Sequence, residues 1–418
     1  MLCEIVISIC KRLKGGKGYR DVLLLCTGEM LMKVIYITDF YYDEACGAKT
    51  SAHAHLKTLQ NLYGSNNVNV IALVGHKFYQ YEQGHKIISG DKNRVLLLLH
   101  CICGYPTFIN KNGVKAILTE IERKNPDVVF IDNSIFGVLI KAIKHKNPSV
   151  IVVSYYHDVK AKLGRDWMLN APWYKKPVYA AMIKNEKLTA SLADVNYTLN
   201  DRETKLYITA YGKKPEAVLP VYMNVPVPNF AAERKGRMAE EPFKLLFFGG
   251  YYLPNVNGID WFIRNVYPLL NNIELVIAGR GMDKLKDKYQ DQHIHIYGEV
   301  ADLAEPYSDA DAVISPIFEG GGMKVKMAEA MAYGKIAIGS DESYEGYSQN
   351  IPASYWNHYF FRANTPREYV DAINELKNIS GLSKYHSEVR EIFEGYYSEQ
   401  YAEKIIDNSI RKAMEKII

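Results

Sequence analysis

Hydrophobic residues in the first half of the chain gather in short, uninterrupted runs and do not alternate with polar residues. These runs are rich in Val and Ile and fall at residues 32–39, 68–74, 127–132, 150–155 and 193–198. Strands with apolar side chains on both faces are covered on both faces, as in parallel sheets flanked by helices. Helical periodicity at 51–59 and 135–145 completes the pattern of a doubly wound α/β domain.

The same alternation of elements begins again after a proline-bearing stretch. Pro220, Pro226 and Pro228, followed by a charged segment, predict a linker. Beyond it, strands are expected at 244–250, 274–278, 293–297, 311–315 and 335–339, and helices at 257–270 and from 385 onward. The chain therefore predicts two Rossmann-like domains that face each other across a cleft.

These patterns predict five segments. Residues 1–31 are an extension before the first strand, 32–225 the first domain, 226–241 the linker, 242–395 the second domain, and 396–418 a helix that crosses back to the first domain. In doubly wound folds, ligands bind outside the carboxyl ends of the strands. We therefore expect the functional residues at those ends, in the cleft between the domains.

Composition is that of an ordinary globular protein. Of 418 residues, 48% are hydrophobic and 23% are charged, and no apolar run approaches the roughly 18 residues that span a bilayer. The amino terminus does not resemble a signal peptide, because its apolar residues precede the Lys11-Arg12 cluster. Six cysteines without metal-binding spacing predict reduced thiols in a cytoplasmic protein, and we expect no metal.

Charge is distributed unevenly. Residues 1–220 hold 30 Lys and Arg against 19 Asp and Glu, whereas the remainder holds 21 against 28. A basic first half favours an anionic contact such as a membrane surface, although ordinary surface charge is the alternative. Aromatic and basic residues interleave at 167–184, which suits a membrane headgroup region, single-stranded nucleic acid or a half-buried helix with snorkelling lysines. No recognised nucleic-acid module accompanies them, so we expect no nucleic-acid partner.

The most informative segment is residues 316–334, which contains a run of three glycines at 320–322. The segment follows an expected strand, and its glycines lead into a short helix that ends at Gly334. Glycines let a ligand approach the backbone, and a helix N-terminus attracts anions, so this is a candidate phosphate site. Lys326 and Glu329 share one face of the helix and would both reach such a ligand. A plain glycine-rich connection is the alternative.

Other strand ends carry candidate residues. Gly249 and Gly250 follow a strand and would admit a phosphate or form a tight turn. No dinucleotide fingerprint and no P-loop sequence exists, which argues against a Rossmann dehydrogenase and a P-loop nucleotidase. His157 and Asp158 end another strand, where a histidine would bond a substrate or act in acid–base chemistry, or be structural.

Several segments of the second half resemble the retaining glycosyltransferases of family 4, which have the two-domain GT-B fold. In order and spacing, the segments are 246–250 (LFFGG), 275–279 (LVIAG), 296–300 (IYGEV), 308–316 (SDADAVISP) and 329–334 (EAMAYG). The first half carries weaker features: Gly47 before a helix, His157-Asp158, Glu186 and Ala193-Asp194-Val195. The resemblance implies an enzyme that uses a nucleotide-sugar donor, a lipid-linked or glycan acceptor and no metal or other cofactor.

The resemblance also implies roles for individual residues. Glu329 would hold the ribose of the donor. The other donor-side residues would be Gly249, Gly250, Gly298, Val300, Gly320, Gly321, Gly322 and Met323. His157 would lie near the transferred sugar, and Gly47 and Asp158 on the acceptor side.

Two features depart from the family pattern. The family separates its paired glutamates by seven residues, whereas Glu319 lies two residues too early and Gly321 occupies the partner position. The loop after Gly250 also lacks the usual cations, and Lys326 is the expected replacement. We include Glu319 and Lys326 with His157 as candidate catalytic residues.

Three functions remain open at this point. The favoured one is a glycosyltransferase of cell-surface glycan synthesis in the cytoplasm, with peripheral contact to the inner face of an anionic membrane. The alternatives are a nucleotide-sugar epimerase and a non-catalytic partner subunit of the same fold.

Overall fold

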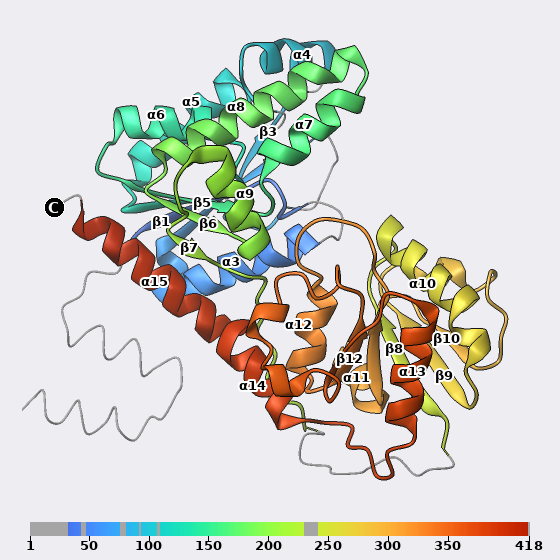
Figure 1. Cartoon of the computed structure of the whole chain (residues 1–418). Helices are drawn as coiled ribbons and strands as arrows, with labels where there is room; N and C mark the ends of the chain where they lie inside the picture. The colour runs from blue at the N-terminus through green and yellow to red at the C-terminus, as the bar shows by residue number, and fades with distance from the viewer. Residues whose placement is uncertain are drawn as a thin grey trace, which may run out of the picture.

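The computed structural model describes residues 32–42, 47–75, 81–91, 93–106, 109–229 and 241–416. The expected extension at 1–31 and residues 230–240 of the expected linker lie outside these ranges. Two parallel sheets, each covered by helices, form two domains that lie one above the other in Figure 1.

The first domain is built on a seven-stranded parallel sheet in the order β3-β2-β1-β4-β5-β6-β7. Its strands are β1 (Val34–Thr38), β2 (Val68–Val74), β3 (Lys86–Ser89), β4 (Val128–Ile131), β5 (Ile151–Tyr156), β6 (Val195–Thr198) and β7 (Ala217–Val218). All residues of β1, β4, β5 and β6 are buried, as expected from their non-alternating sequences. The five predicted strands are thus present, and the two short edge strands β3 and β7 were not predicted.

The second domain is built on a six-stranded parallel sheet in the order β10-β9-β8-β11-β12-β13. Its strands are β8 (Phe243–Phe248), β9 (Ile273–Ala278), β10 (Ile294–Ile296), β11 (Ala312–Ser315), β12 (Ile336–Gly339) and β13 (Phe360–Arg362). The chain reverses direction across the sheet between β10 and β11, so the carboxyl ends of β8 and β11 lie beside a topological switch point.

Helices cover both faces of each sheet (Figure 1). Those of the first domain are α3 (Gly47–Tyr63), α4 (Arg94–Ile102), α5 (Lys111–Lys124), α6 (Gly137–Lys146), α7 (Lys160–Asn170), α8 (Lys176–Leu192) and α9 (Asp201–Tyr211). Those of the second are α10 (Leu253–Asn265), α11 (Ala304–Asp309), α12 (Val325–Ala332) and α13 (Pro366–Lys377). Local sequence sets several of their starts: Thr365 and Glu368 form a capping box before α13, for example.

The last two helices join the domains. After α14 (Ser387–Tyr396), helix α15 (Glu399–Glu415) runs back along the first domain and packs against α3 (Figure 1). It buries Ala402, Ile406 and Ile410 there. The segment between α14 and α15 lies beside the stretch after β7 in which the chain leaves the first domain, because the Met223 amide donates to the Tyr397 carbonyl (3.0 Å). The described helices include none that is long and apolar enough to cross a membrane.

Candidate functional site

The carboxyl ends of strands from both domains meet where α12 begins. A Cβ atom on Gly47, at the start of α3, would lie 3.7 Å from Val325 Cγ2, at the start of α12. One on Gly322 would lie 3.5 Å from Leu199 Cδ2, just beyond β6. The structure therefore brings the glycine run of the second domain against strand ends of the first, as the sequence predicts.

The N-terminus of α12 is shaped for an anion. Gly320 and Gly322 have φ of 114° and 68°, a backbone region that favours glycine, so the chain turns sharply into the helix. Among the described residues, no side chain caps the helix; the Met327 amide donates to the Lys324 carbonyl (2.9 Å), which leaves the amides of Val325 and Lys326 to face a ligand. Lys324, which precedes it, donates to Glu342 (2.8 Å) and is therefore neutralised. The open amides and the helix dipole together favour a negatively charged ligand.

Lys326 is buried at this point and faces the other glycine loop. Its Nζ donates to Asn255 Oδ1 (2.7 Å) and lies 4.2 Å from the centre of the Phe247 ring. A Cβ on Gly249 would come within 3.1 Å of this Nζ, so the ammonium lies directly against the loop after β8. Burial lowers the pKa of Lys326 to about 7. None of the described carboxylates forms an ion pair with Lys326, so an anionic ligand would stabilise its charged form.

Glu329 lies one turn further along α12 and is half-buried. The Tyr307 hydroxyl donates to its Oε2 (3.2 Å), and the Tyr307 ring stacks on Tyr333 with centroids 4.5 Å apart. Burial raises the pKa of Glu329 to about 7, although the Tyr307 bond and the nearby Lys326 oppose this. Its other oxygen, Oε1, accepts no hydrogen bond from any of the described residues. A carboxylate placed this way can accept hydrogen bonds from a pair of hydroxyl groups.

Glu319 is separated from these two residues. Its side chain is exposed and accepts a hydrogen bond from Asn257 Nδ2 (2.9 Å) on α10. The two extra residues before Glu329 thus place this carboxylate on the α10 side of the loop. Its catalytic role stays a prediction.

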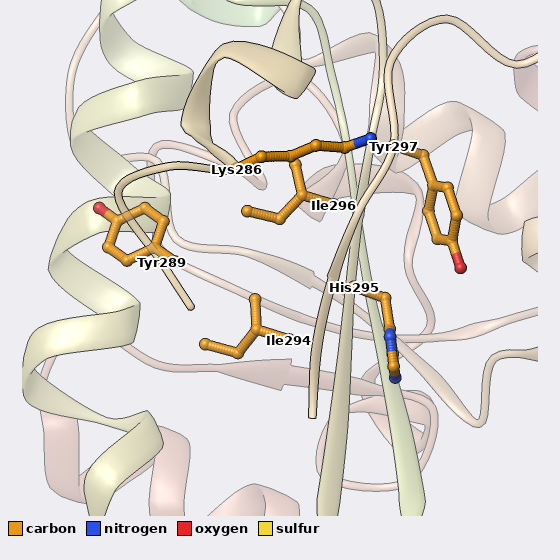
Figure 2. Close-up of a pocket in the computed structure, with 6 residues that line it drawn as sticks. All are labelled: Lys286, Tyr289, Ile294, His295, Ile296 and Tyr297. Carbon is orange, nitrogen blue, oxygen red and sulfur yellow. The ribbon is translucent and has the colours of Figure 1, made fainter. Parts of the chain in front are cut away.

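Gly298 lies two residues beyond the end of β10. Its carbonyl accepts from the Gly279 amide (3.0 Å), and a Cβ on it would meet Asp283 Oδ1 at 3.0 Å. Val300 follows it by two residues. The side chains of β10 point alternately to its two sides (Figure 2), beside a pocket of about 270 Å³ lined by Lys286, Tyr289, Ile294, His295, Ile296 and Tyr297. This pocket lies at the outer edge of the sheet, next to the segment expected near the base.

In the first domain, His157 is part of a cluster. Its Nε2 lies 3.1 Å from Asp132 Oδ1, and the same oxygen lies 2.9 Å from His55 Nδ1. The Tyr36 hydroxyl donates to the other oxygen of Asp132 (2.6 Å). Asp132 is fully buried; burial opposes its ionisation, but the two histidines outweigh this and hold its pKa well below the usual range. Asp132 therefore orients the His157 ring through Nε2, and within the part of the chain that the structure describes no hydrogen bond engages the other ring nitrogen.

Sequence analysis missed Asp132 and His55. Asp132 directly follows β4, which pairs with β5, the strand that ends before His157. The two strand ends are neighbours in the sheet, and that adjacency was the available signal. His53 lies two positions earlier on α3, on another face of the helix, and its Nε2 lies 3.1 Å from the Tyr41 carbonyl oxygen. The described residues hold no group of three His, Cys, Asp or Glu side chains that could bind a metal ion.

Asp158 and Glu186 shape the start of α7. Asp158 forms an ion pair with Lys160. Glu186 is buried and accepts from the amides of Lys160 and Ala161 (2.9 Å each) and from Ser134 Oγ (2.7 Å). Glu186 thus binds the first turn of α7 to the β4 loop and has a structural role. The acceptor-side role of Asp158 stays a prediction.

An ion-pair network links the domains beside the site. Arg202 on α9 contacts Glu342 (3.1 Å) and Glu345 (3.8 Å), and Glu342 also contacts Lys324. A cavity of about 750 Å³ lies between α9 and residues 341–349. The two domains are therefore joined beside the N-terminus of α12 by ion pairs whose side chains are partly exposed to solvent.

Comparisons with known proteins agree with this geometry. Residues 242–378 match the family model of glycosyl transferases group 1. No curated protein matches in sequence. Solved structures match almost end to end: the lipopolysaccharide outer core galactosyltransferase WaaB in its apo form has a TM-score of 0.62 and 16% identity, with coverage of 91% of this chain and 99% of that one.

Two further structures are similar to the same extent. Anabaena HepE in complex with UDP has a TM-score of 0.63 at 11% identity and covers 91% and 100% of the two chains. TarM has a TM-score of 0.60 at 12% identity, with 91% and 99% covered. These likenesses confirm the predicted fold class. The chain therefore has the two-domain fold of the GT-B glycosyltransferases, and residues 242–378 of its second domain match the family model of glycosyl transferases group 1.

Proposed function

We propose that the protein transfers a sugar from a nucleoside diphosphate sugar to a hydroxyl group of a lipid-linked or polysaccharide acceptor in cell-surface glycan synthesis. One observation carries the donor assignment. The buried Lys326 and the half-buried Glu329 share one face of α12, beside the Gly249 loop and behind an uncapped helix N-terminus. This set of groups offers a cation and amides to a diphosphate, and a carboxylate to the adjoining ribose.

The residues divide the chemistry between them. As the bond to the sugar breaks, negative charge develops on the diphosphate, which the α12 amides and Lys326 would stabilise. Charge neutralisation is thus assigned to side-chain and main-chain groups without a metal. Glu329 would accept hydrogen bonds from the ribose hydroxyls. UDP in the Anabaena HepE structures makes UDP-sugars the first donors to test.

The acceptor side is assigned to the first domain. His157 lies at the end of β5, with one nitrogen held by Asp132, and would contact the transferred sugar or the attacking hydroxyl. Gly47 and Asp158 would border the acceptor. Retention of configuration is proposed on the family resemblance, with attack on the face from which the leaving group departs. Location in the cytoplasm at the inner face of the membrane completes the proposal.

Calorimetry with UDP, GDP and their sugars tests the donor site. The intact protein is expected to bind one nucleoside diphosphate, and Glu329→Ala is expected to abolish or weaken that binding at least tenfold. Glu375→Ala, an exposed glutamate on α13, serves as the matched control and should bind like the parent. Absence of affinity for every nucleoside diphosphate would refute the proposal.

Turnover distinguishes the remaining alternatives. Slow hydrolysis of the bound donor in the presence of EDTA, with product anomers followed by NMR, is expected for a metal-independent retaining transferase. Conversion of the donor to an epimer without an acceptor would identify an epimerase instead. Binding without turnover across the donor panel would identify a non-catalytic subunit.

A further inference from the structure

Helix α4 presents apolar side chains to solvent. Arg94 and His100 are the only basic residues in its nine positions, and none of the nine is acidic. Val95, Leu96, Leu99 and Ile102 are exposed by 65%, 48%, 50% and 63%, respectively. Positions 95, 99 and 102 recur at helical spacing, so they form one stripe on the outer face. A surface helix normally places such a stripe against the core, and α4 does the reverse.

A second apolar group lies beside it, where α7 ends and α8 begins. Leu169 is 77% exposed and Trp173 is 80% exposed, with Tyr174 packed edge-on against Trp173 at 6.1 Å. Both α4 and α7 contact α8, and the Asn185 side chain of α8 donates to the Gly104 carbonyl just after α4 (2.8 Å). Figure 1 shows α4 with these helices at the end of the first domain farthest from the second. We name the exposed residues of α4 and of 167–176 the α4–α7 surface.

Basic residues surround the apolar ones. Residues 160–176 hold five Lys and Arg and a single Asp. Lys175 and Lys176 directly follow Trp173 and Tyr174, are exposed, and form no ion pair within the described part of the chain. Exposed Arg94 begins α4, and Lys184 lies close to Gly104. Apolar and aromatic side chains bordered by unpaired cations match the interface of a membrane with anionic headgroups.

We propose that the α4–α7 surface is the part of the protein that docks on an anionic lipid bilayer, with α4 lying in the plane of the interface. This inference deepens the proposed function. The surface itself is argued from exposure and charge, and only the purpose of docking, access to a lipid-linked acceptor, rests on the proposed function. Helix α7 begins two residues after Asp158 and has 11 residues, so about 16 Å separates the candidate acceptor side from Leu169. A lipid-linked acceptor could therefore remain anchored while its head group reaches the cleft.

Co-sedimentation of the full chain with vesicles tests the proposal. Binding is expected to vesicles containing 30% phosphatidylglycerol, to be weak with phosphatidylcholine alone, and to fall as salt rises. Each lysine near such a surface contributes about fivefold in affinity, so Lys175→Gln with Lys176→Gln should weaken binding roughly 25-fold. Leu99→Asp should weaken it further. Leu269→Asp, at an equally exposed position of the second domain, is the matched control and should bind normally.

Trp173 supplies a direct reporter. Its emission is expected to shift to shorter wavelength on addition of anionic vesicles, and Trp173→Phe should lose the shift. Equal binding to both vesicle types, no binding, or insensitivity to Leu99→Asp would overturn the proposal. Self-association that Leu99→Asp abolishes would overturn it too, because the surface would then join two copies. Calorimetry with nucleoside diphosphates on the same variants is independent of these results, so failure here leaves the donor site standing.

Discussion

Replacing Lys326 by methionine is expected to separate ligand affinity from stability. The lysine is 6% exposed, forms no ion pair with a carboxylate among the residues that the structure describes, and has a pKa that burial lowers from 10.5 to about 7. Methionine has a similar length and no charge to desolvate. The variant should therefore bind a nucleoside diphosphate far more weakly than the parent and yet unfold less readily.

The structure sets the size of the effect. One pKa unit corresponds to about 1.4 kcal/mol, so holding Lys326 charged in the fold costs up to about 5 kcal/mol. The hydrogen bond to Asn255 and the contact with Phe247 offset part of this, and the variant leaves the Asn255 oxygen without its partner, at roughly 1–3 kcal/mol. A net gain of about 1–3 kcal/mol in the free energy of unfolding remains. Loss of the cation should cost the diphosphate complex at least about tenfold in affinity.

The gain should depend on pH in a defined direction. Folded Lys326 releases its proton near pH 7, whereas the unfolded chain keeps it to about pH 10.5. The unfolded state therefore binds more protons in this window, and the free energy of unfolding of the parent rises with pH there. The advantage of Lys326→Met is largest below pH 7 and shrinks towards pH 10.5. Urea denaturation followed by tryptophan fluorescence at pH 6, 8 and 9.5 measures it.

Lys335 supplies the matched control. It is buried in the same domain, and burial lowers its pKa to about 7 too, but it lies before β12 and donates to the Ala310 carbonyl (2.8 Å). Lys335→Met should alter stability and leave nucleotide affinity as in the parent. If Lys326→Met were less stable than the parent at pH 6, or bound nucleotide equally well, the assignment of this lysine to the anion site would be wrong.

Three further outcomes follow from named contacts. Asp132→Asn should lower the free energy of unfolding at pH 7 by roughly 3–5 kcal/mol and reduce turnover. Because the pKa of Asp132 is lower in the folded than in the unfolded state, this difference between variant and parent should shrink below about pH 4. Denaturation at pH 7 and pH 3 would measure it. Gly279→Ala would place a Cβ 2.1 Å from the Gly249 carbonyl oxygen, so calorimetry should show at least tenfold weaker donor binding. Gly395→Ala, on α14 with open space around it, should raise the free energy of unfolding by about 0.5–1 kcal/mol without changing donor affinity; a loss of stability would contradict this.

The fold followed from the sequence because apolar runs are a direct consequence of burial. Every predicted strand corresponds to one in the structure, since a run such as that of β5 can only be covered on both faces. The strands β3, β7 and β13 escaped prediction for the opposite reason. They have two to four residues, lie at sheet edges, and are defined by backbone pairing with a neighbour instead of by their own hydrophobic pattern.

Sequence predicted the part of the candidate site in the second domain but not the part in the first. The glycine run and α12 are contiguous in sequence, and the three-residue spacing of Lys326 and Glu329 places both side chains on one face of the helix. Asp132 and His55 are 77 residues apart and meet because α3, which carries His55, packs on β1, the neighbour of β4 in the sheet. Burial of Lys326 against Phe247 likewise depends on packing between β8 and α12, which no local pattern encodes.

Helix α15 has a consequence for how the protein is made. The first domain is complete only when residues 399–415 cover α3, yet these residues leave the ribosome after the whole second domain. The second domain can therefore acquire its native structure during translation while the first waits with an unfinished apolar surface. Chains cut short before residue 399 should accordingly aggregate through that surface, even though every predicted site residue has already been synthesised.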